Sequence, residues 1–330
     1  MEGLRVLEWI RHRDGIWNMP PEEIARLNAE FPSVTILSPP TREASDALLP
    51  EADIVLGFAV REDNFARAKR LRWIHSTAAG VEWILFPELV RSDIALTCSR
   101  GLHAVSIAEH TLGVMLAFAR QLHLSRDAQR ERRWSQSAQW EAGPGFAQLQ
   151  GGTVGIVGFG HIGRAIGERC RALGMHVLAV RRHPAADPAP AHEQWGSDRL
   201  AELLERSDWV VLAAPHTGET RGMIGAAELA RMQPSARLLN IGRGALVDER
   251  ALIAALESGR LAGAGLDVFE QEPLPDASPL WALPQVIASP HVSGLGPDYW
   301  ARASEVFARN LRLWLAGRPL ENVVDKQAGY

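Results

Sequence analysis

The sequence predicts an α/β protein with two domains, each built on a parallel sheet that helices cover. Three observations lead to this prediction. Short apolar runs of strand type alternate with helical patterns up to residue 100, the same alternation returns between residues 153 and 290, and a glycine-rich turn opens this second stretch. Alternating strands and helices are typical of parallel sheets, and a chain of 330 residues has room for two domains of ~150 residues each. We therefore expect two Rossmann-like or flavodoxin-like domains with a cleft between them.

Strand and helix signals follow one another from the N-terminus. Strands are expected at 4–9, 33–37, 52–57, 73–76 and 94–97. Pro20 and Pro21 open a helix that runs to Glu30, because proline is favoured in the first helical turn, and a charged helix is expected at 62–70. This half of the chain lacks a phosphate-type glycine motif, so we do not expect a nucleotide there.

The turn after the fourth of these strands, at 76–82, consists largely of small residues. Small side chains leave backbone N–H groups accessible to an anion such as a carboxylate. A plain connection between a strand and a helix has the same composition, so the turn alone leaves both interpretations open.

A long helix is expected at 101–122. Residues such as Ile107, Met115 and Phe118 place apolar side chains on most of its faces, and a helix of this kind is buried between layers, domains or subunits. The charged run at 126–133 is interpreted as a solvated helix face, because the net charge of −4 gives no reason to expect nucleic acid. A loop at 141–150 follows.

The stretch at 153–163 combines a β-branched strand, a glycine turn and the start of an apolar-periodic helix. Gly158, Gly160 and Gly163 fill the pattern G-x-G-x-x-G, in which the glycines allow a tight turn, close approach to a pyrophosphate and close packing of the helix on the strand. The start of the helix then holds the phosphates through its N–H groups and its dipole. The residues expected to contact a dinucleotide in this turn are Gly158, Phe159, Gly160, His161, Ile162 and Gly163.

The strand expected at 175–180 indicates which dinucleotide binds. An acidic residue at its carboxyl end would bond the ribose 2′-hydroxyl of NAD, but this sequence has Arg181 and Arg182 there. A guanidinium group matches a 2′-phosphate bidentately and stays charged. We therefore predict that NADP(H) is preferred over NAD(H), with a solvated basic loop as the alternative.

Further strands are expected at 209–214, 237–241, 263–269 and 285–289. A helix capped by Asp248 and closed by Gly259 lies between the second and third of them. A last amphipathic helix begins at Pro297.

Arg243, Glu272 and His291 each follow the end of one of these strands. The carboxyl ends of parallel strands border the ligand crevice, so the three side chains should gather there. Reduction of a 2-oxo acid needs a proton donor such as histidine, a carboxylate that raises its pKa, and an arginine that binds the substrate carboxylate and polarises the carbonyl. Taken singly, these residues have plain interpretations as a buried histidine, a helix cap and a surface ion pair. Their shared placement favours catalysis.

The composition, with 46% hydrophobic and 22% charged residues, is that of a globular protein. No apolar run approaches the ~18 residues of a membrane span, and residues 1–13 lack the apolar core of a signal peptide. Cys98 and Cys170 are far apart, as in a reducing compartment, so we expect a cytoplasmic protein. His75 and His103 lack partners at metal-ligand spacing, so no metal is expected.

The sequence resembles the D-isomer-specific 2-hydroxyacid dehydrogenase family over nearly its whole length. The resemblance rests on GIVGFGHIG at 155–163, NIGRG at 240–244, LDVFEQEPLP at 266–275 and SPHVSG at 289–294, with further similarity at 76–82, 107–110 and 322–325. It implies that Arg243, Glu272 and His291 are the catalytic residues. It also implies that Asp267 contacts the nicotinamide amide, and that the backbone of Ala79 and Gly80 holds the substrate carboxylate.

The resemblance further implies a domain organisation and an assembly. Residues 1–100 plus 295–330 would form a discontinuous substrate domain, residues 101–294 a dinucleotide-binding Rossmann domain, and the helix after residue 101 the centre of a homodimer. The remaining residues expected to contact the cofactor are Ala214, Pro215, Thr220, Ile241, Asp267, Ser293 and Gly294.

Two departures from the family pattern narrow the expected activity. Arg181 stands where NAD-preferring members carry an acid, which favours the glyoxylate/hydroxypyruvate reductase branch, and Glu272 is not the glutamine of the formate dehydrogenase branch. We expect an oxidoreductase that transfers a hydride between NADP(H) and a small 2-oxo or 2-hydroxy acid such as glyoxylate or hydroxypyruvate, with His291 as the acid/base. The alternative is an NAD(H)-sensing, corepressor-like interaction protein that keeps the fold without significant turnover.

Overall fold

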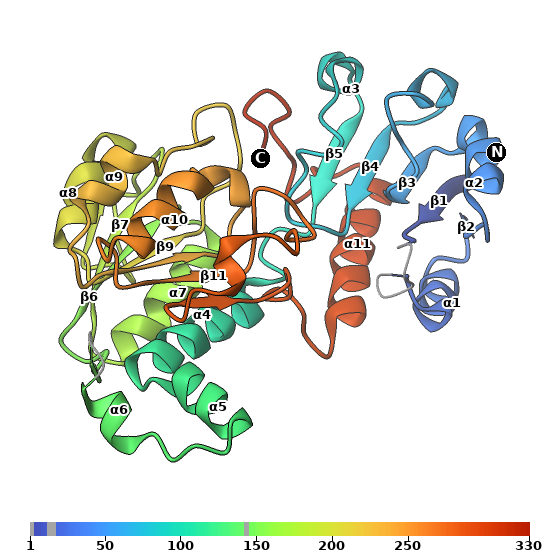
Figure 1. Cartoon of the computed structure of the whole chain (residues 1–330). Helices are drawn as coiled ribbons and strands as arrows, with labels where there is room; N and C mark the ends of the chain where they lie inside the picture. The colour runs from blue at the N-terminus through green and yellow to red at the C-terminus, as the bar shows by residue number, and fades with distance from the viewer. Residues whose placement is uncertain (1–2, 12–17, 142–144) are drawn as a thin grey trace. The chain divides into compact units, whose positions relative to one another are not determined.

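The computed structural model describes residues 3–11, 18–141 and 145–330. The chain divides into two compact units: unit 1 is Met1–Leu102 with Gly296–Tyr330, and unit 2 is His103–Leu295. Each unit has its own parallel sheet with helices against it (Figure 1). The predicted fold class, two parallel-sheet α/β domains, is therefore confirmed.

The sheet of unit 1 has five parallel strands in the order β2-β1-β3-β4-β5. Their bounds are β1 Leu4–Trp9, β2 Val34–Leu37, β3 Ile54–Gly57, β4 Trp73–Ser76 and β5 Ala95–Cys98. The central strands are buried on both faces, as expected of a sheet covered by helices. Their carboxyl ends share one edge, and the turn at 76–82 leaves the sheet there.

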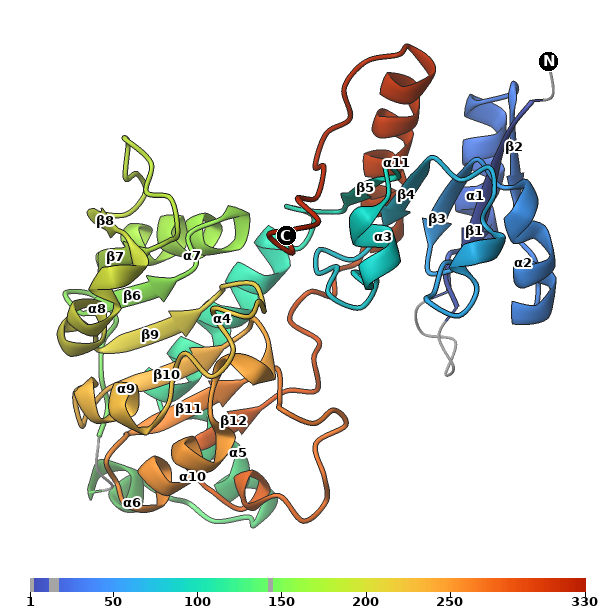
Figure 2. The same ribbon diagram turned by 90° about the horizontal axis from the view of Figure 1, so that it is seen from above.

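Helices cover both faces of this sheet. α1 (Pro21–Glu30) and α11 (Tyr299–Leu315) pack together on one face, where Leu27, Phe307 and Leu311 lie in one apolar cluster. α2 (Arg42–Leu48) and α3 (Pro87–Arg91) belong to the other face. The last helix of the chain therefore completes the N-terminal unit, as Figure 2 shows.

The prediction of a charged helix at 62–70 is wrong. Only a 3-10 turn, Phe65–Arg67, forms there. The Asn64 side chain accepts a hydrogen bond from the Arg61 amide at 2.8 Å and donates to the Ala59 carbonyl at 2.9 Å. Such local side-chain bonds compete with helix formation.

The sheet of unit 2 has seven parallel strands in the order β12-β11-β10-β9-β6-β7-β8. Their bounds are β6 Thr153–Val157, β7 His176–Val180, β8 Glu193–Trp195, β9 Trp209–Leu212, β10 Arg237–Asn240, β11 Gly263–Leu266 and β12 Val286–Ala288. All but β8 were expected from the sequence. β8 pairs with β7 and lengthens the sheet at one edge.

Two apolar clusters hold helices against this sheet. α4 (Ala104–Ala119) and α7 (His161–Ala172) cover one face. α8 (Leu200–Arg206), α9 (Ala226–Arg231) and α10 (Glu249–Glu257) cover the other. The cap predicted for α10 is present, since the Asp248 side chain accepts a hydrogen bond from the Ala251 amide at 3.1 Å.

The long helix predicted at 101–122 is shorter than expected. α4 ends at Ala119, and Gln121 takes a left-handed conformation with φ of 52° before α5 (Leu122–Arg130) begins. α6 (Gln136–Glu141) follows, and part of the loop predicted at 141–150 lies outside the described residues. Among the described helices, none has the length and apolar character needed to cross a membrane.

Candidate active site

The glycine turn joins β6 to α7 in unit 2, and two of its glycines are required by the packing. Gly158 has φ of +92°, and a Cβ there would lie 2.5 Å from the Ala214 nitrogen. A Cβ at Gly163 would collide with the carbonyl oxygen of Gly158. Gly158 therefore allows the tight turn, and Gly163 allows the helix to approach the strand.

Gly160 has a different environment. A Cβ at this position would meet no atom of the described residues within 4 Å, so the space above the turn is open. Gly160 is also the N-cap of α7, and no side chain caps the helix there. Open space beside uncapped helix amides suits a pyrophosphate, so this turn fits the dinucleotide that the sequence predicts.

Three neighbouring strands bring candidate residues to one edge of the sheet. β12, β11 and β10 lie side by side and run parallel. Beyond their carboxyl ends follow His291, Asp267 and Arg243, with Glu272 a little after Asp267. Sheet order thus gathers residues that are far apart in the sequence.

His291 and Glu272 form a hydrogen-bonded pair. Nδ1 of His291 lies 2.8 Å from Oε2 of Glu272, and the other carboxylate oxygen accepts the Phe269 amide at 3.1 Å. Both side chains are partly exposed, at 50% for His291 and 37% for Glu272. Because Nδ1 faces the carboxylate, Nε2 is the ring nitrogen that can exchange a proton with a ligand.

The pair shifts both pKa values. The hydrogen bond to Glu272 raises the pKa of His291, against the opposing effects of burial and of the Arg243 charge. Burial raises the pKa of the Glu272 carboxyl, but the hydrogen bonds from His291 and the Phe269 amide outweigh it, so that pKa is lowered. The geometry therefore favours an imidazolium beside a carboxylate.

Arg243 follows β10 in an extended conformation. Its carbonyl accepts a hydrogen bond from the Asn240 side chain at 2.8 Å, and its guanidinium donates to the Gly242 carbonyl at 2.8 Å. Its positive charge lowers the pKa values of both His291 and Glu272. The structure thus brings the three predicted catalytic residues into electrostatic contact.

Asp267 has a role that the sequence did not reveal. Its side chain is buried, and its carboxylate accepts hydrogen bonds from the Ser289 hydroxyl at 2.6 Å and from the Val292 and Ser293 amides at 3.0 Å each. These donors flank His291, which has a left-handed φ of 54°. The only sequence signal of this role of Asp267 is an acidic residue directly after a buried strand. The nicotinamide contact implied for Asp267 stays a prediction.

His110 joins the same cluster from α4. Its Nε2 lies 3.2 Å from the Ser289 hydroxyl and 4.0 Å from a carboxylate oxygen of Asp267. His110 therefore contacts Ser289 and Asp267, which also hold the turn that carries His291.

In unit 1, Ala79 and Gly80 lie in the turn that leaves β4. Neighbouring carbonyls are hydrogen-bonded: Ala78 accepts the Ser99 amide at 3.2 Å, and Gly80 accepts the Trp83 indole at 3.2 Å. Within the described parts of the chain, the amides of Ala79 and Gly80 have no acceptor. Two unpaired amides in sequence suit a carboxylate.

The two arginines predicted to bind a 2′-phosphate differ in their surroundings. Arg182 forms an ion pair with Glu219. Arg181 directly follows β7, and no carboxylate among the described residues pairs with its guanidinium. Arg181 is therefore the better placed of the two to meet an anion.

The remaining predicted cofactor residues lie at strand ends of unit 2. The Thr220 hydroxyl donates to the Pro215 carbonyl at 2.7 Å, which fixes the segment after β9. The Gly294 carbonyl lies 3.0 Å from Nδ1 of His103. Ala214 and Ile241 are buried beyond β9 and β10, and Ser293 is held by Asp267.

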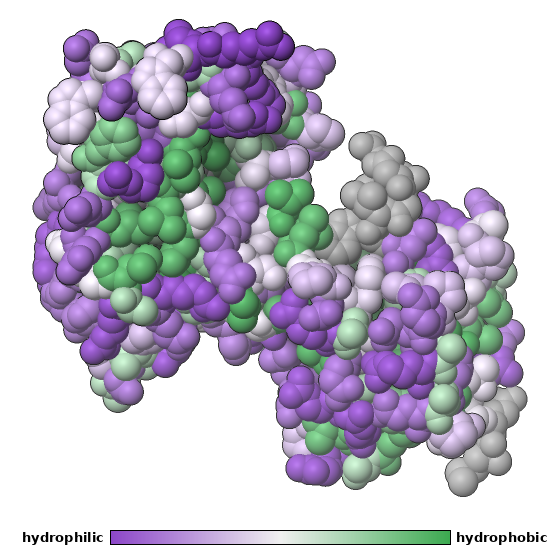
Figure 3. Space-filling model, turned by 90° about the horizontal axis from the view of Figure 1, so that it is seen from below, coloured by the Kyte–Doolittle hydropathy of each residue, from purple (hydrophilic) through white to green (hydrophobic). Residues whose placement is uncertain are grey.

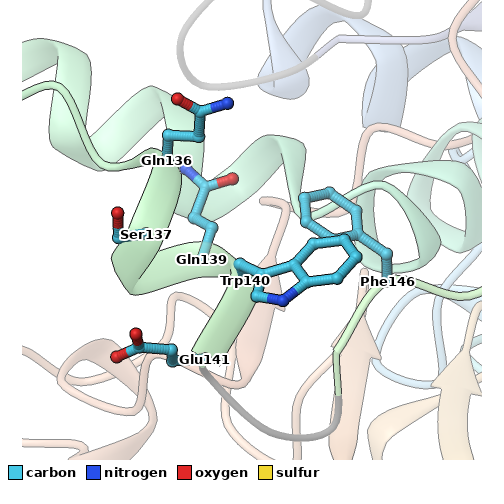
Figure 4. A pocket seen from close by; sticks show the side chains of 6 residues that line it. All are labelled: Gln136, Ser137, Gln139, Trp140, Glu141 and Phe146. Carbon is cyan, nitrogen blue, oxygen red and sulfur yellow. The ribbon is translucent and has the colours of Figure 1, made fainter.

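The concavity drawn in Figure 4 lies apart from these residues. It has a volume of 430 Å³ and is lined by α6 side chains, among them Trp140, and by Phe146. None of the predicted site residues lines it. In the stretches that the structure describes, no group of three or more His, Cys, Asp or Glu side chains could hold a metal ion.

Comparison with known proteins identifies the family. Residues 112–293 match the family model described as D-isomer specific 2-hydroxyacid dehydrogenase, NAD binding domain. A glyoxylate reductase of Pyrococcus furiosus is 35% identical over 280 residues, which is 83% of this chain and 81% of that protein.

Solved structures agree over the full length. A D-isomer specific 2-hydroxyacid dehydrogenase family protein from Aeromonas salmonicida has a TM-score of 0.84 and 32% identity, covering 98% of this chain and 99% of that one. An NADPH-dependent glyoxylate/hydroxypyruvate reductase from Sinorhizobium meliloti, solved with NADP and sulfate, has a TM-score of 0.81 and 28% identity, covering 99% and 100%. The chain belongs to the D-isomer-specific 2-hydroxyacid dehydrogenase family of NAD(P)-dependent oxidoreductases.

Proposed function

We propose that this oxidoreductase reduces small 2-oxo acids, such as glyoxylate or hydroxypyruvate, with NADP(H) as its preferred cofactor. The observation that carries the proposal is the 2.8 Å hydrogen bond between His291 and Glu272, beside the charge of Arg243. A proton donor, a carboxylate that keeps it protonated and a cation are the groups that reduction of a 2-oxo acid requires.

Each side chain has a defined task in this mechanism. Arg243 binds the carboxylate of the substrate and polarises its carbonyl. NADPH, when bound, would supply the hydride for the carbonyl carbon. His291 delivers the proton from Nε2 to the new alkoxide oxygen, and Glu272 stabilises the imidazolium until the transfer. The amides of Ala79 and Gly80 hold the substrate carboxylate.

The preference for NADPH rests on Arg181. This guanidinium follows β7, where the adenosine ribose of a dinucleotide is expected, and it has no carboxylate partner among the described residues. The similar Sinorhizobium meliloti enzyme is itself described as NADPH-dependent. The pyrophosphate would bind at Gly158, Gly160 and Gly163.

We also propose that unit 1 is the substrate domain, that unit 2 is the dinucleotide domain and that the protein is a homodimer. Apolar side chains gather on the face of unit 2 at the left of Figure 3. Leu116 of α4 and Leu122 of α5 are 40% and 55% exposed, which favours a partner against these helices. A cytoplasmic location fits Cys98 and Cys170, which are free and buried thiols.

Turnover tests the proposal directly. The protein is mixed with NADPH and glyoxylate, and the nicotinamide absorbance is followed; hydroxypyruvate, pyruvate and bulkier 2-oxo acids are then compared. We expect turnover of the small acids, and His291→Ala should abolish it while NADPH binding persists. Binding of NADPH without turnover of any 2-oxo acid would instead favour a dinucleotide-sensing protein.

A further inference from the structure

The turn after β4 is held by side chains from outside it. The Tyr299 hydroxyl, at the start of α11, donates to the Thr77 carbonyl at 3.2 Å. The Ser99 amide donates to the Ser76 carbonyl at 3.0 Å, and the Ser99 hydroxyl donates to the same carbonyl at 3.3 Å. Tyr299 and Ser99 are both buried. The carbonyls that precede Ala79 are thus fixed by residues far away in the sequence.

A chain of buried polar side chains orients Ser99. The Trp73 indole donates to the Thr97 hydroxyl at 2.8 Å, and this hydroxyl lies 2.7 Å from Nδ1 of His75. Nε2 of His75 lies 3.4 Å from the Ser99 hydroxyl. One proton arrangement satisfies every contact: Thr97 donates to Nδ1, His75 donates from Nε2 to Ser99, and Ser99 donates to the Ser76 carbonyl.

His75 remains uncharged in this chain. Complete burial lowers its pKa to about 3, so the ring is neutral at physiological pH and keeps one donor and one acceptor. The mechanism proposed above does not use this histidine. Its partners connect it to the turn rather than to a ligand.

These bonds leave the next two amides unpaired. With the carbonyls of Ser76, Thr77 and Ala78 fixed, the N–H groups of Ala79 and Gly80 find no acceptor within the described residues. An amide that has no hydrogen bond within the protein can bind an anion without first breaking one. Loss of the Tyr299 or Ser99 hydrogen bond would let the turn relax. The Ala79 and Gly80 amides would then bond to another part of the chain or lose their alignment.

We propose that Tyr299 and Ser99 are positioning residues, which hold the turn at 76–80 so that the Ala79 and Gly80 amides stay available for the substrate carboxylate. This inference rests on the proposed function, in which that turn binds the carboxylate. Tyr299 and Ser99 contact the turn at the Thr77 and Ser76 carbonyls, so both act through the backbone. Their contribution falls on carboxylate binding rather than on proton transfer.

The Tyr299→Phe variant removes the hydroxyl and keeps the ring. We expect the KM for glyoxylate to rise about two- to tenfold, as for the loss of one hydrogen bond, while kcat and the Kd for NADPH change less than about twofold. Tyr330→Phe, at the only other tyrosine of the chain, is the matched control and should keep the wild-type KM.

The Ser99→Ala variant tests the second support. Ser92→Ala is its control, because the Ser92 hydroxyl also donates to a carbonyl, that of Leu89 at 2.8 Å, just before β5. We expect Ser99→Ala to raise the KM for glyoxylate by about two- to tenfold and the control to leave it unchanged. Unchanged KM values in both Tyr299→Phe and Ser99→Ala would overturn the inference.

Binding of oxamate separates this inference from the proposed function. Oxamate carries the carboxylate and carbonyl of a 2-oxo acid, and its Kd for the NADPH-bound protein is measured by calorimetry without turnover. We expect Tyr299→Phe and Ser99→Ala to raise the Kd of oxamate by the same factor by which they raise the KM for glyoxylate. A wild-type protein that binds oxamate but reduces no 2-oxo acid would refute the proposed function alone. Equal oxamate affinity in wild type and both variants would refute the positioning role.

Discussion

The amide nitrogen of Ser293 lies 3.0 Å from a carboxylate oxygen of Asp267. The other oxygen of this buried carboxylate accepts the Ser289 hydroxyl and the Val292 amide. The turn that carries His291 is thus tied on both sides to the end of β11. Since His291 has φ of 54°, a conformation that non-glycine residues rarely adopt, these bonds offset the strain of presenting the imidazole.

Asp267→Asn should therefore lower kcat. One of the acceptor oxygens becomes a donor facing an amide, and a small displacement of His291 costs about 10- to 100-fold in rate. Kinetics with glyoxylate and the Kd for NADPH are measured together, because a direct contact of Asp267 with the cofactor would also weaken NADPH binding. Asp276→Asn, at an exposed position in the segment after Glu272, is the control. An unchanged kcat in the Asp267→Asn variant would show that Asp267 does not position His291 for catalysis.

The rate of reduction should fall as the pH rises. His291 must be protonated to act as the acid, and Glu272 raises its pKa, so the active form persists to a higher pH than an ordinary histidine allows. Glu272→Gln removes the charge that favours the imidazolium. In this variant, the descending limb of the pH profile of kcat/KM for glyoxylate should move to lower pH. The rate at neutral pH should fall by about 100-fold or more. A limb that stays in place would mean that another group donates the proton.

Much of the fold could be predicted from the sequence because strands buried on both faces read as short apolar runs. β1 and β4 form at the predicted residues. The errors have local physical causes. Asn64 forms side-chain bonds that replace the charged helix at 62–70, and β8 is too short and polar to give a strand signal.

The site follows the same division. The positions of Arg243, Glu272 and His291 after strands suggested that they gather, because strand ends share an edge in a parallel sheet. The hydrogen bonds of Asp267 to Ser289 and beyond join segments far apart in the chain. No local pattern encodes such a contact, so it became visible only in the structure.

Exchange of Arg181 should change the choice of cofactor. Arg181→Asp replaces the guanidinium by a carboxylate that repels a 2′-phosphate and accepts a hydrogen bond from a 2′-hydroxyl. We expect kcat/KM for NADPH to fall about 10- to 100-fold, as for the loss of a charged hydrogen-bonded pair, and that for NADH to hold or rise. Arg182→Asp is the comparison, and it should have the smaller effect because Arg182 is paired with Glu219. An unchanged preference for NADPH over NADH in the Arg181→Asp variant would refute the proposal that Arg181 binds the 2′-phosphate.

The neutral state of buried His75 should make the protein less stable in mild acid. Burial lowers its pKa to about 3 in the folded protein, whereas the pKa of a histidine in the unfolded chain is ~6.5. Below that pH the unfolded state binds a proton that the folded state does not, so the free energy of unfolding should fall by up to about 1.4 kcal/mol per pH unit. Urea unfolding between pH 7 and pH 5 measures how the free energy of unfolding changes with pH. His75→Gln should remove from this slope the contribution of one bound proton. The same substitution at exposed His183 is the control, and equal slopes in the two variants would contradict the argument.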